Sequence, residues 1–158
     1  MKASLKLGID FSLTSAVITS LGLMVGLSAS TNSVLIVISG LLTMAIADSM
    51  SDALGIHISQ EGNKKITHKE AWESTIATFI GKFFTTLFFI LPIIFLELHI
   101  AIILNIFIGL IIISFISYNI AKEKKEKILN KLIEHLAIAI MVIVLTQIAG
   151  TMIAQLLI

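Results

Sequence analysis

The sequence SVLIVISGLLTMAIADSMSDALGIHISQ (residues 33–60) decides the fold, because it is long and apolar enough to cross a membrane as one helix. It nevertheless carries two aspartates, Asp48 and Asp52, one helical turn apart. Successive residues advance by about 100° around a helix, so Met44, Asp48 and Asp52 share a face. A charge inside hydrocarbon costs at least about 2.5–3.5 kcal/mol, and ionisable groups found there are functional by default. We interpret this face as a candidate site. The alternative is a carboxylate pair, neutralised by a buried cation or by protons, that only fixes helix packing.

The composition of the whole chain is that of a membrane protein. Of the 158 residues, 57% are hydrophobic and only 13% are charged, whereas a soluble domain is near half apolar and about a quarter charged. The length corresponds to one domain, residues 1–158. The net charge of +1 gives no reason to expect a nucleic-acid partner, because the basic residues cluster in short segments between apolar spans. We therefore expect an all-α protein embedded in a lipid bilayer.

Two residue types are missing from the sequence, and each narrows the chemistry. There is no cysteine, which excludes disulfides, thiolate metal sites and a cysteine nucleophile. All eleven basic residues are lysines. Without arginine the chain has no planar fork that binds carboxylate or phosphate through two hydrogen bonds, which argues against phosphate-bearing substrates.

Five apolar spans predict five transmembrane helices, over residues 7–28, 33–60, 74–96, 100–120 and 131–157. Each has about 20 or more residues, enough for about 30 Å of hydrocarbon. Lysines lie at the N-terminus, as Lys2 and Lys6, and in the segments after the second and fourth helices, while the alternate connections have none. By the positive-inside rule the N-terminus is cytoplasmic and the C-terminus is outside. We expect an integral protein of the cytoplasmic membrane of a prokaryote.

Two more charges lie inside predicted spans, Asp10 in the first and Lys82 in the third. Counting residues from the predicted helix ends places Asp48 and Lys82 at one depth, and Asp10 and Asp52 at another. We predict an Asp48–Lys82 ion pair beside an open carboxylate site at Asp10 and Asp52. The alternative for Lys82 is snorkelling toward the interface, which its position in the middle of the span makes difficult.

A stripe of small residues runs along the first predicted helix. Its members recur at three- and four-residue steps and are Ser12, Ser15, Thr19, Gly22 and Gly26. Small side chains let the backbone of another helix approach closely within a membrane. We expect small-residue faces of this kind to support a homodimer.

Carboxylates and a thioether that converge from membrane helices suit a divalent cation of intermediate softness, such as Fe²⁺ or Mn²⁺. A buried carboxylate can also exchange a proton for a cation.

Enzyme classes fit the sequence less well than transport does. The pair Asp48 and Asp52 is shorter than the aspartate array of an intramembrane phosphatidyltransferase, and neither residue follows glycine as in a membrane aspartyl protease. No Gly-x-Ser-x-Gly elbow is present. We expect no enzymatic activity and no permanently bound cofactor.

Three segments resemble the first three helices of the vacuolar iron transporter family. They are GIDFSLTSAVITSLGLMVGLSAS (residues 8–30), IADSMSDALGIHISQE (46–61) and KEAWESTIATFIGKFFTTLFFILP (69–92). The resemblance implies a homodimer whose first two helices line an ion path, with export of Fe²⁺ or Mn²⁺ from the cytoplasm against protons. It implies that Asp10 matches the first-helix aspartate of that path. Met44 and Asp52 match the Glu and Met that the family places eight residues apart, with the two ligand types exchanged.

The sequence departs from that family at two places. The cytoplasmic metal-binding insert between the second and third helices is missing, with only residues 61–73 in its place, and Lys82 puts a positive charge on the path. We predict a metal transporter with Asp10, Met44 and Asp52 as ligands, and with Asp48 as a fourth ligand or as the partner of Lys82. The alternatives are a transporter of another solute, such as an organic cation, and a non-transporting membrane subunit in which the Asp–Lys pair only specifies assembly.

Overall fold

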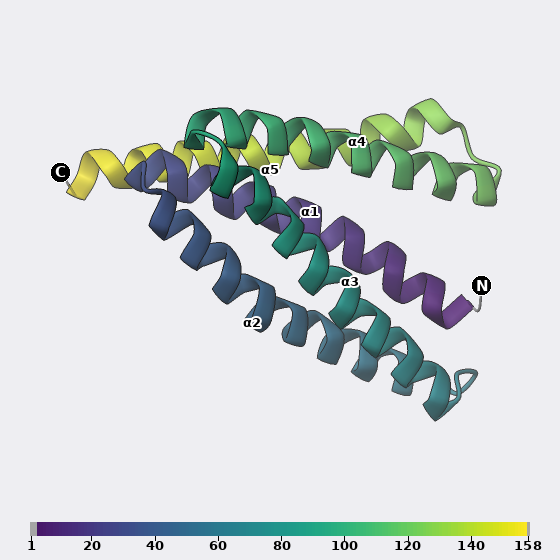
Figure 1. Cartoon of the computed structure of the whole chain (residues 1–158). Coiled ribbons are helices and arrows are strands. Elements are labelled where there is room, and N and C mark those ends of the chain that lie inside the picture. The colour runs from purple at the N-terminus through teal and green to yellow at the C-terminus, as the bar shows by residue number, and fades with distance from the viewer. Residues whose placement is uncertain (1–2, 158) are drawn as a thin grey trace.

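The computed structural model describes residues 3–157, which form five helices joined by short connections (Figure 1). The helices are α1 (Ala3–Thr31), α2 (Val34–Glu61), α3 (His68–Phe95), α4 (Leu98–Lys124) and α5 (Ile128–Leu157). No part of this range forms a strand. All five helices are long and apolar enough to cross a membrane. The predicted all-α fold with five spans is therefore confirmed, while Lys2 lies outside the described residues.

The helices are longer than their apolar cores, and the start of α3 shows why. Helix α3 begins at His68. We expected this residue to lie in a polar connection between a helix that ends at residue 60 and a helix that starts at residue 74. Thr67 Oγ1 accepts a hydrogen bond from Glu70 N at 3.3 Å, and the Glu70 carboxylate accepts one from Thr67 N at 2.9 Å. This capping box satisfies two of the backbone N–H groups that a helix start leaves unpaired, so polar residues can begin the helix.

The five helices run alternately up and down. The N-terminal end, the α2–α3 connection and the α4–α5 connection lie at one end of the bundle, and the other connections and the C-terminal end lie opposite (Figure 1). An ion pair between Lys6 and Glu123 joins the start of α1 to the end of α4 at the first of these ends. The lysine-bearing segments therefore share one end of the molecule.

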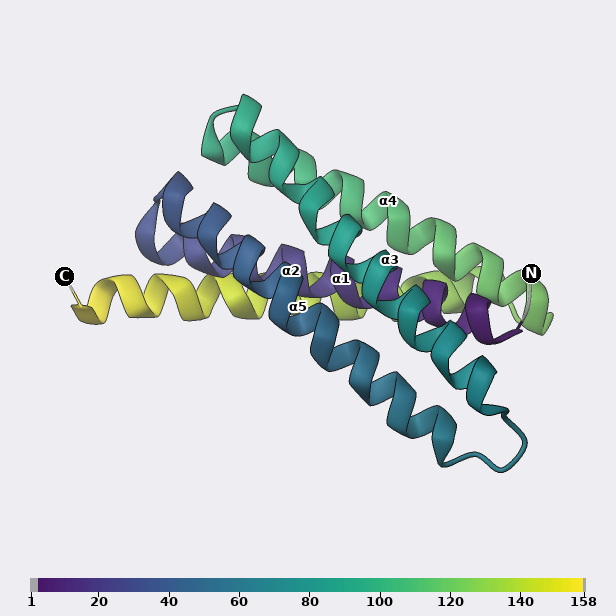
Figure 2. The ribbon, with the colours of Figure 1, turned by 60° about the horizontal axis from the view of Figure 1, so that its bottom comes forward.

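Helix α1 lies at the centre of the packing, because it contacts all four other helices, and α3 runs along both α1 and α2 (Figure 2). The apolar core lies between α1, α3 and α4 and includes Val17, Leu21, Phe89 and Ile113. The outer face of α2 instead exposes a row of large apolar side chains, Leu42, Ile46, Met50, Leu54 and Ile58. Such a face suits contact with lipid rather than with water.

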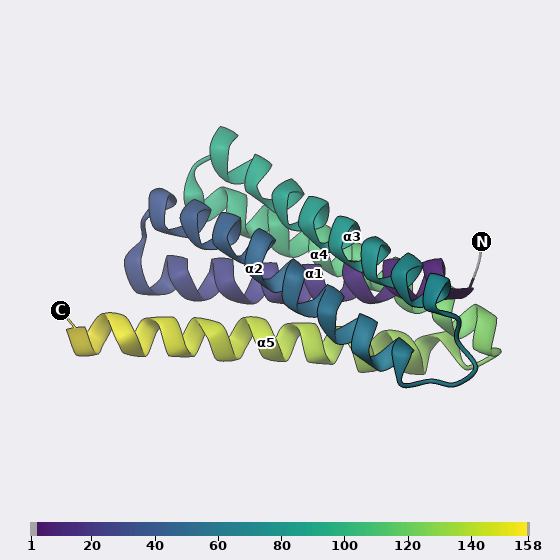
Figure 3. The same cartoon turned by 90° about the horizontal axis from the view of Figure 1, so that it is seen from below.

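Helix α5 covers part of the small-residue stripe on α1 (Figure 3). A Cβ added at Gly150 of α5 would overlap the carbonyl oxygen of Gly26, and one added at Gly22 would lie 2.9 Å from Val142 Cγ1. The close approach that these glycines predict is therefore present within one chain.

Candidate cation site

A fully buried lysine lies at the centre of the structure. Lys82 is 14 residues after His68, the first residue of α3, and 13 before Phe95, its last. Its side chain is only 1% exposed, and its Nζ lies 2.6 Å from Asp48 Oδ2. Nζ also donates hydrogen bonds to Asp52 Oδ2 and, at 2.9 Å, to Ser15 Oγ. The ammonium is thus held by three oxygen atoms from α1 and α2.

Ser15 closes this arrangement into a triangle. Its hydroxyl donates a hydrogen bond to Asp52 Oδ2 at 2.7 Å while it accepts the one from Lys82. The contact at Asp48 is ionic and lacks the geometry of a hydrogen bond. Asp52 therefore accepts hydrogen bonds from Lys82 and Ser15, whereas Asp48 is paired with Lys82 through the ionic contact alone. Sequence reasoning placed Ser15 only among small packing residues, because a serine carries no charge that would mark it as a partner.

The predicted Asp48–Lys82 ion pair is present, but Asp52 differs from the prediction. It is not an open carboxylate, since it shares the same ammonium. The pairing is what allows a lysine at this depth, because removing one partner of a buried ion pair costs about 3–5 kcal/mol. Thr78 and Thr86, the neighbours of Lys82 on its face of α3, are fully buried as well. This polar face of α3 therefore points into the interior of the bundle.

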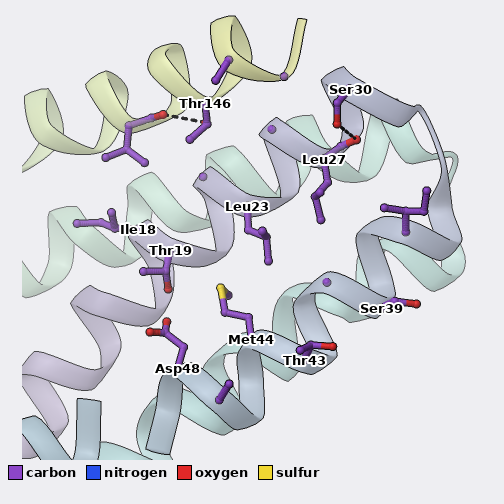
Figure 4. Close-up of a pocket in the computed structure, with 18 of the residues that line it drawn as sticks. Ile18, Thr19, Leu23, Leu27, Ser30, Ser39, Thr43, Met44, Asp48 and Thr146 are labelled. Carbon is purple, nitrogen blue, oxygen red and sulfur yellow. Dashed lines mark hydrogen bonds between the residues drawn. The ribbon is translucent and has the colours of Figure 1, made fainter. Parts of the chain in front are cut away.

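An open groove meets the ion pair from the side of α2. It lies between α1, α2 and α5 and has a volume of about 1370 Å³. Met44 and Asp48 point from α2 into this groove, toward Thr19 of α1 (Figure 4). The Asp48 side chain is 30% exposed, compared with 1% for Lys82. Asp48 is therefore the side chain through which the groove reaches the buried ammonium.

The structure does not bring Asp10 to this place. Its ion-pair partner is Lys6, at 4.0 Å on the same helix, and it precedes Ser15 by five residues, or about 7.5 Å along the axis. Counting from the predicted helix ends placed Asp10 level with Asp52, but Ser15 is the residue found there. The difference arises because the helices cross at an angle (Figure 2), so equal distances from the helix ends do not place two residues side by side.

The acidic site thus consists of Asp48 and Asp52, with Met44 one turn before Asp48 on α2. Among residues 3–157 no group of three or more histidine, cysteine, aspartate or glutamate side chains is placed to hold a metal ion. In the described state the carboxylates hold the ammonium of Lys82. The chemistry that the arrangement offers is reversible binding of a cation to oxygen ligands, with a thioether nearby.

A second polar cluster ties the ends of α2 and α3 together. His57 Nε2 and His68 Nδ1 each lie 3.3 Å from Glu61 Oε1. Trp72 Nε1 donates a hydrogen bond to His68 Nε2 at 3.1 Å, and His57 Nδ1 lies 2.9 Å from Thr75 Oγ1. These contacts fix the hairpin that carries Asp48, Asp52 and Lys82 at the end where its connection lies.

No family model, curated protein or solved structure matches this chain. The resemblance to the vacuolar iron transporters stays a prediction from sequence, and the functional interpretation depends on the geometry of the site.

Proposed function

We propose that this chain carries a divalent metal cation, Fe²⁺ or Mn²⁺, across a membrane in exchange for protons. The observation that carries the proposal is the buried ammonium of Lys82, held between Asp48 and Asp52 midway along helices of membrane-spanning length. The fold already binds a cation at this place. Ionisable groups at such a depth mark ion and proton paths more often than they serve packing alone.

The groove supplies the route to the site. Met44 contributes a thioether and Asp48 a carboxylate to its wall, a combination that suits metals between the hard and soft extremes. Asp10 is an outlying carboxylate in this proposal, since it does not line the groove and its ion-pair partner on the same helix is Lys6. The activity is transport rather than catalysis, and the metal is the substrate rather than a resident cofactor.

Orientation and oligomeric state are part of the same proposal. The lysine-bearing connections lie together at one end of the bundle, so the positive-inside rule assigns that end, with the N-terminus, to the cytoplasm. Export therefore runs from that end toward the C-terminal end. The groove leaves Asp48 partly exposed at a depth where lipid would meet it, and a second copy of the chain, in a homodimer, would cover it.

A structural role is the second candidate function, and one observation favours it. Lys82 contacts both carboxylates and is almost completely buried, as expected if the charges only specify how the helices assemble. In that case the chain is a non-transporting membrane subunit, and it shows no metal flux on its own.

Metal flux into proteoliposomes under an imposed pH gradient separates these candidates. We expect proton-dependent Fe²⁺ or Mn²⁺ flux from the native chain, and a loss of about tenfold or more in Asp52→Ala. The matched control is Ser49→Ala, which removes a buried hydroxyl without a hydrogen-bond partner from the same helix and should keep the flux. No metal flux from well-folded native protein would contradict the proposal, and flux of an organic cation instead would redirect it to another solute.

A further inference from the structure

The groove beside Asp48 has more room than a metal ion needs. Its volume of about 1370 Å³ exceeds the roughly 300–1,000 Å³ of typical small-molecule sites. Its wall is mainly apolar and is built from α1, α2 and α5, with Leu23, Leu27, Leu35, Ile36 and Ile153 among its side chains. Leu23 and Leu27 point from α1 into the space that Met44 enters from α2 (Figure 4). The size and the lining therefore suit an organic molecule.

Asp48 places a negative charge in this apolar wall. Among the described residues that line the groove, it is the one with an ionisable side chain. Its Oδ2 atom is buried against Lys82 Nζ at 2.6 Å, whereas the side chain as a whole is 30% exposed. The exposed part is the part that faces the groove, so a ligand there would meet a carboxylate among apolar groups.

The neighbouring charges leave this carboxylate attractive to another cation. Asp48 and Asp52 carry one negative charge each, and Lys82, which contacts both, carries one positive charge. The cluster is therefore negative by one charge. Attraction to a cation is strong at such a place, because apolar side chains keep water away and lower the dielectric constant.

We propose that the groove between α1, α2 and α5 is a binding site for lipophilic organic cations, which place their positive charge beside Asp48 and their apolar groups against the leucine and isoleucine wall. The inference goes beyond transport of a metal, because it requires only the groove and the charge of Asp48. A cation whose charge is spread over an apolar body can reach the groove through the lipid. A second copy of the chain that lies across the mouth of the groove would enclose this volume, whereas a copy whose helix enters the groove would take the place of the ligand.

The test is binding of tetraphenylphosphonium to the purified full chain in phosphatidylcholine nanodiscs, measured in excess of binding to empty nanodiscs. Tetraphenylborate carries the same four phenyl groups and a negative charge, so the two ions separate the effect of charge from that of apolarity. We expect the native chain to bind tetraphenylphosphonium at least about tenfold more tightly than tetraphenylborate. Asp48→Asn keeps the shape of the side chain and leaves Lys82 paired with Asp52, and it should weaken tetraphenylphosphonium binding by about tenfold or more.

Two phenylalanine variants of adjacent residues test the place of binding. Ala47 lines the groove, so Ala47→Phe should fill the space beside Asp48 and abolish binding although the carboxylate is kept. Ile46 belongs to the outer face of α2 and is 62% exposed. Ile46→Phe is therefore the matched control and should bind tetraphenylphosphonium as the native chain does.

Several results would overturn the proposal. They are a native chain that does not bind tetraphenylphosphonium, equal binding of the two ions, and native-like binding by Asp48→Asn or by Ala47→Phe. A native dimer that binds neither ion, and that Ala47→Phe converts to a monomer, would instead assign the groove to a second copy of the chain.

Discussion

At Ser15, a side chain small enough for close helix packing also supplies an oxygen atom to a buried ammonium. The same hydroxyl donates to Asp52, so it connects α1 to charges on both α2 and α3. Hydrogen bonds to charged groups contribute about 1.5–3 kcal/mol, roughly twice as much as those between neutral groups. A single serine can therefore matter to stability as much as a large apolar side chain does.

We predict that Ser15→Ala lowers the free energy of unfolding by about 1.5–3 kcal/mol, because Lys82 loses an acceptor and Asp52 loses a donor. Ser12→Ala is the control, since Ser12 is a fully buried serine of the same helix that donates only to Ile9 O of that helix, at 2.9 Å. Thermal unfolding of the purified variants in detergent measures both. If the two variants are equally stable, Ser15 acts only in packing.

Sequence reasoning found part of this site for a physical reason. Charges inside apolar spans are costly, so Asp48 and Lys82 are recognisable in the sequence as candidate site residues. Their similar predicted depths were enough to pair them. Whether Asp52 is a second partner of Lys82 depends on how α2 is rotated about its axis. Residues four apart differ by about 40° in direction, and the sequence does not show whether the ammonium lies between two such side chains or beside one.

At the scale of the helices, hydropathy located each span, and polar contacts set its ends. The start of α3 lies in the polar segment because Thr67 and Glu70 cap it. A hydropathy pattern follows the apolar interior and passes over such caps. A hydropathy pattern also does not show what packs against a glycine, because that partner depends on which helix lies opposite.

Gly8 and Gly55 provide a prediction about helix packing. A Cβ on Gly8 of α1 would lie 2.5 Å from Ser74 O and 2.8 Å from Ala77 Cβ of α3, whereas one on Gly55 of α2 would meet nothing within 4 Å. We expect Gly8→Ala to destabilise the protein by about 1–3 kcal/mol through this clash. Gly55→Ala should stabilise it by about 0.4–1 kcal/mol, because it restricts the unfolded chain.

Thermal unfolding in detergent measures both alanine variants against the native chain. No loss of stability in Gly8→Ala would show that α1 and α3 are not packed as described, and a loss in Gly55→Ala would show that the face of α2 at Gly55 is not open as described.

For the molecule as a whole, the number of spans and their alternation followed from sequence, but the neighbours of each helix did not. Lipid-facing and core-facing sides of a membrane helix are both apolar, so periodicity does not reveal which side packs. The row from Leu42 to Ile58 faces outward although it is as hydrophobic as the core. Only the polar residues and glycines carried information about partners, and they were few.

The orientation of the bundle gives a third prediction. Because the chain has no cysteine, single cysteines can be introduced as reporters at Lys65, in the α2–α3 connection, and at His99, at the opposite end, both of which are exposed. We expect a membrane-impermeant maleimide to label Lys65→Cys only from the cytoplasmic side and His99→Cys only from the other side. The reverse pattern in intact cells and inverted vesicles would invert the proposed direction of transport.

The ion pairs between Lys82 of α3 and the two aspartates of α2 also affect how the protein is inserted into the membrane. A lysine at the centre of a lone helix opposes insertion by about 2.5–3.5 kcal/mol, and each aspartate adds a similar cost. The two helices are separated only by residues 62–67, so the ribosome delivers them in immediate succession. Lys82 reaches the translocation channel just behind the carboxylates that neutralise it. The pair can then leave the channel sideways into lipid as one hairpin, at lower cost than either helix alone.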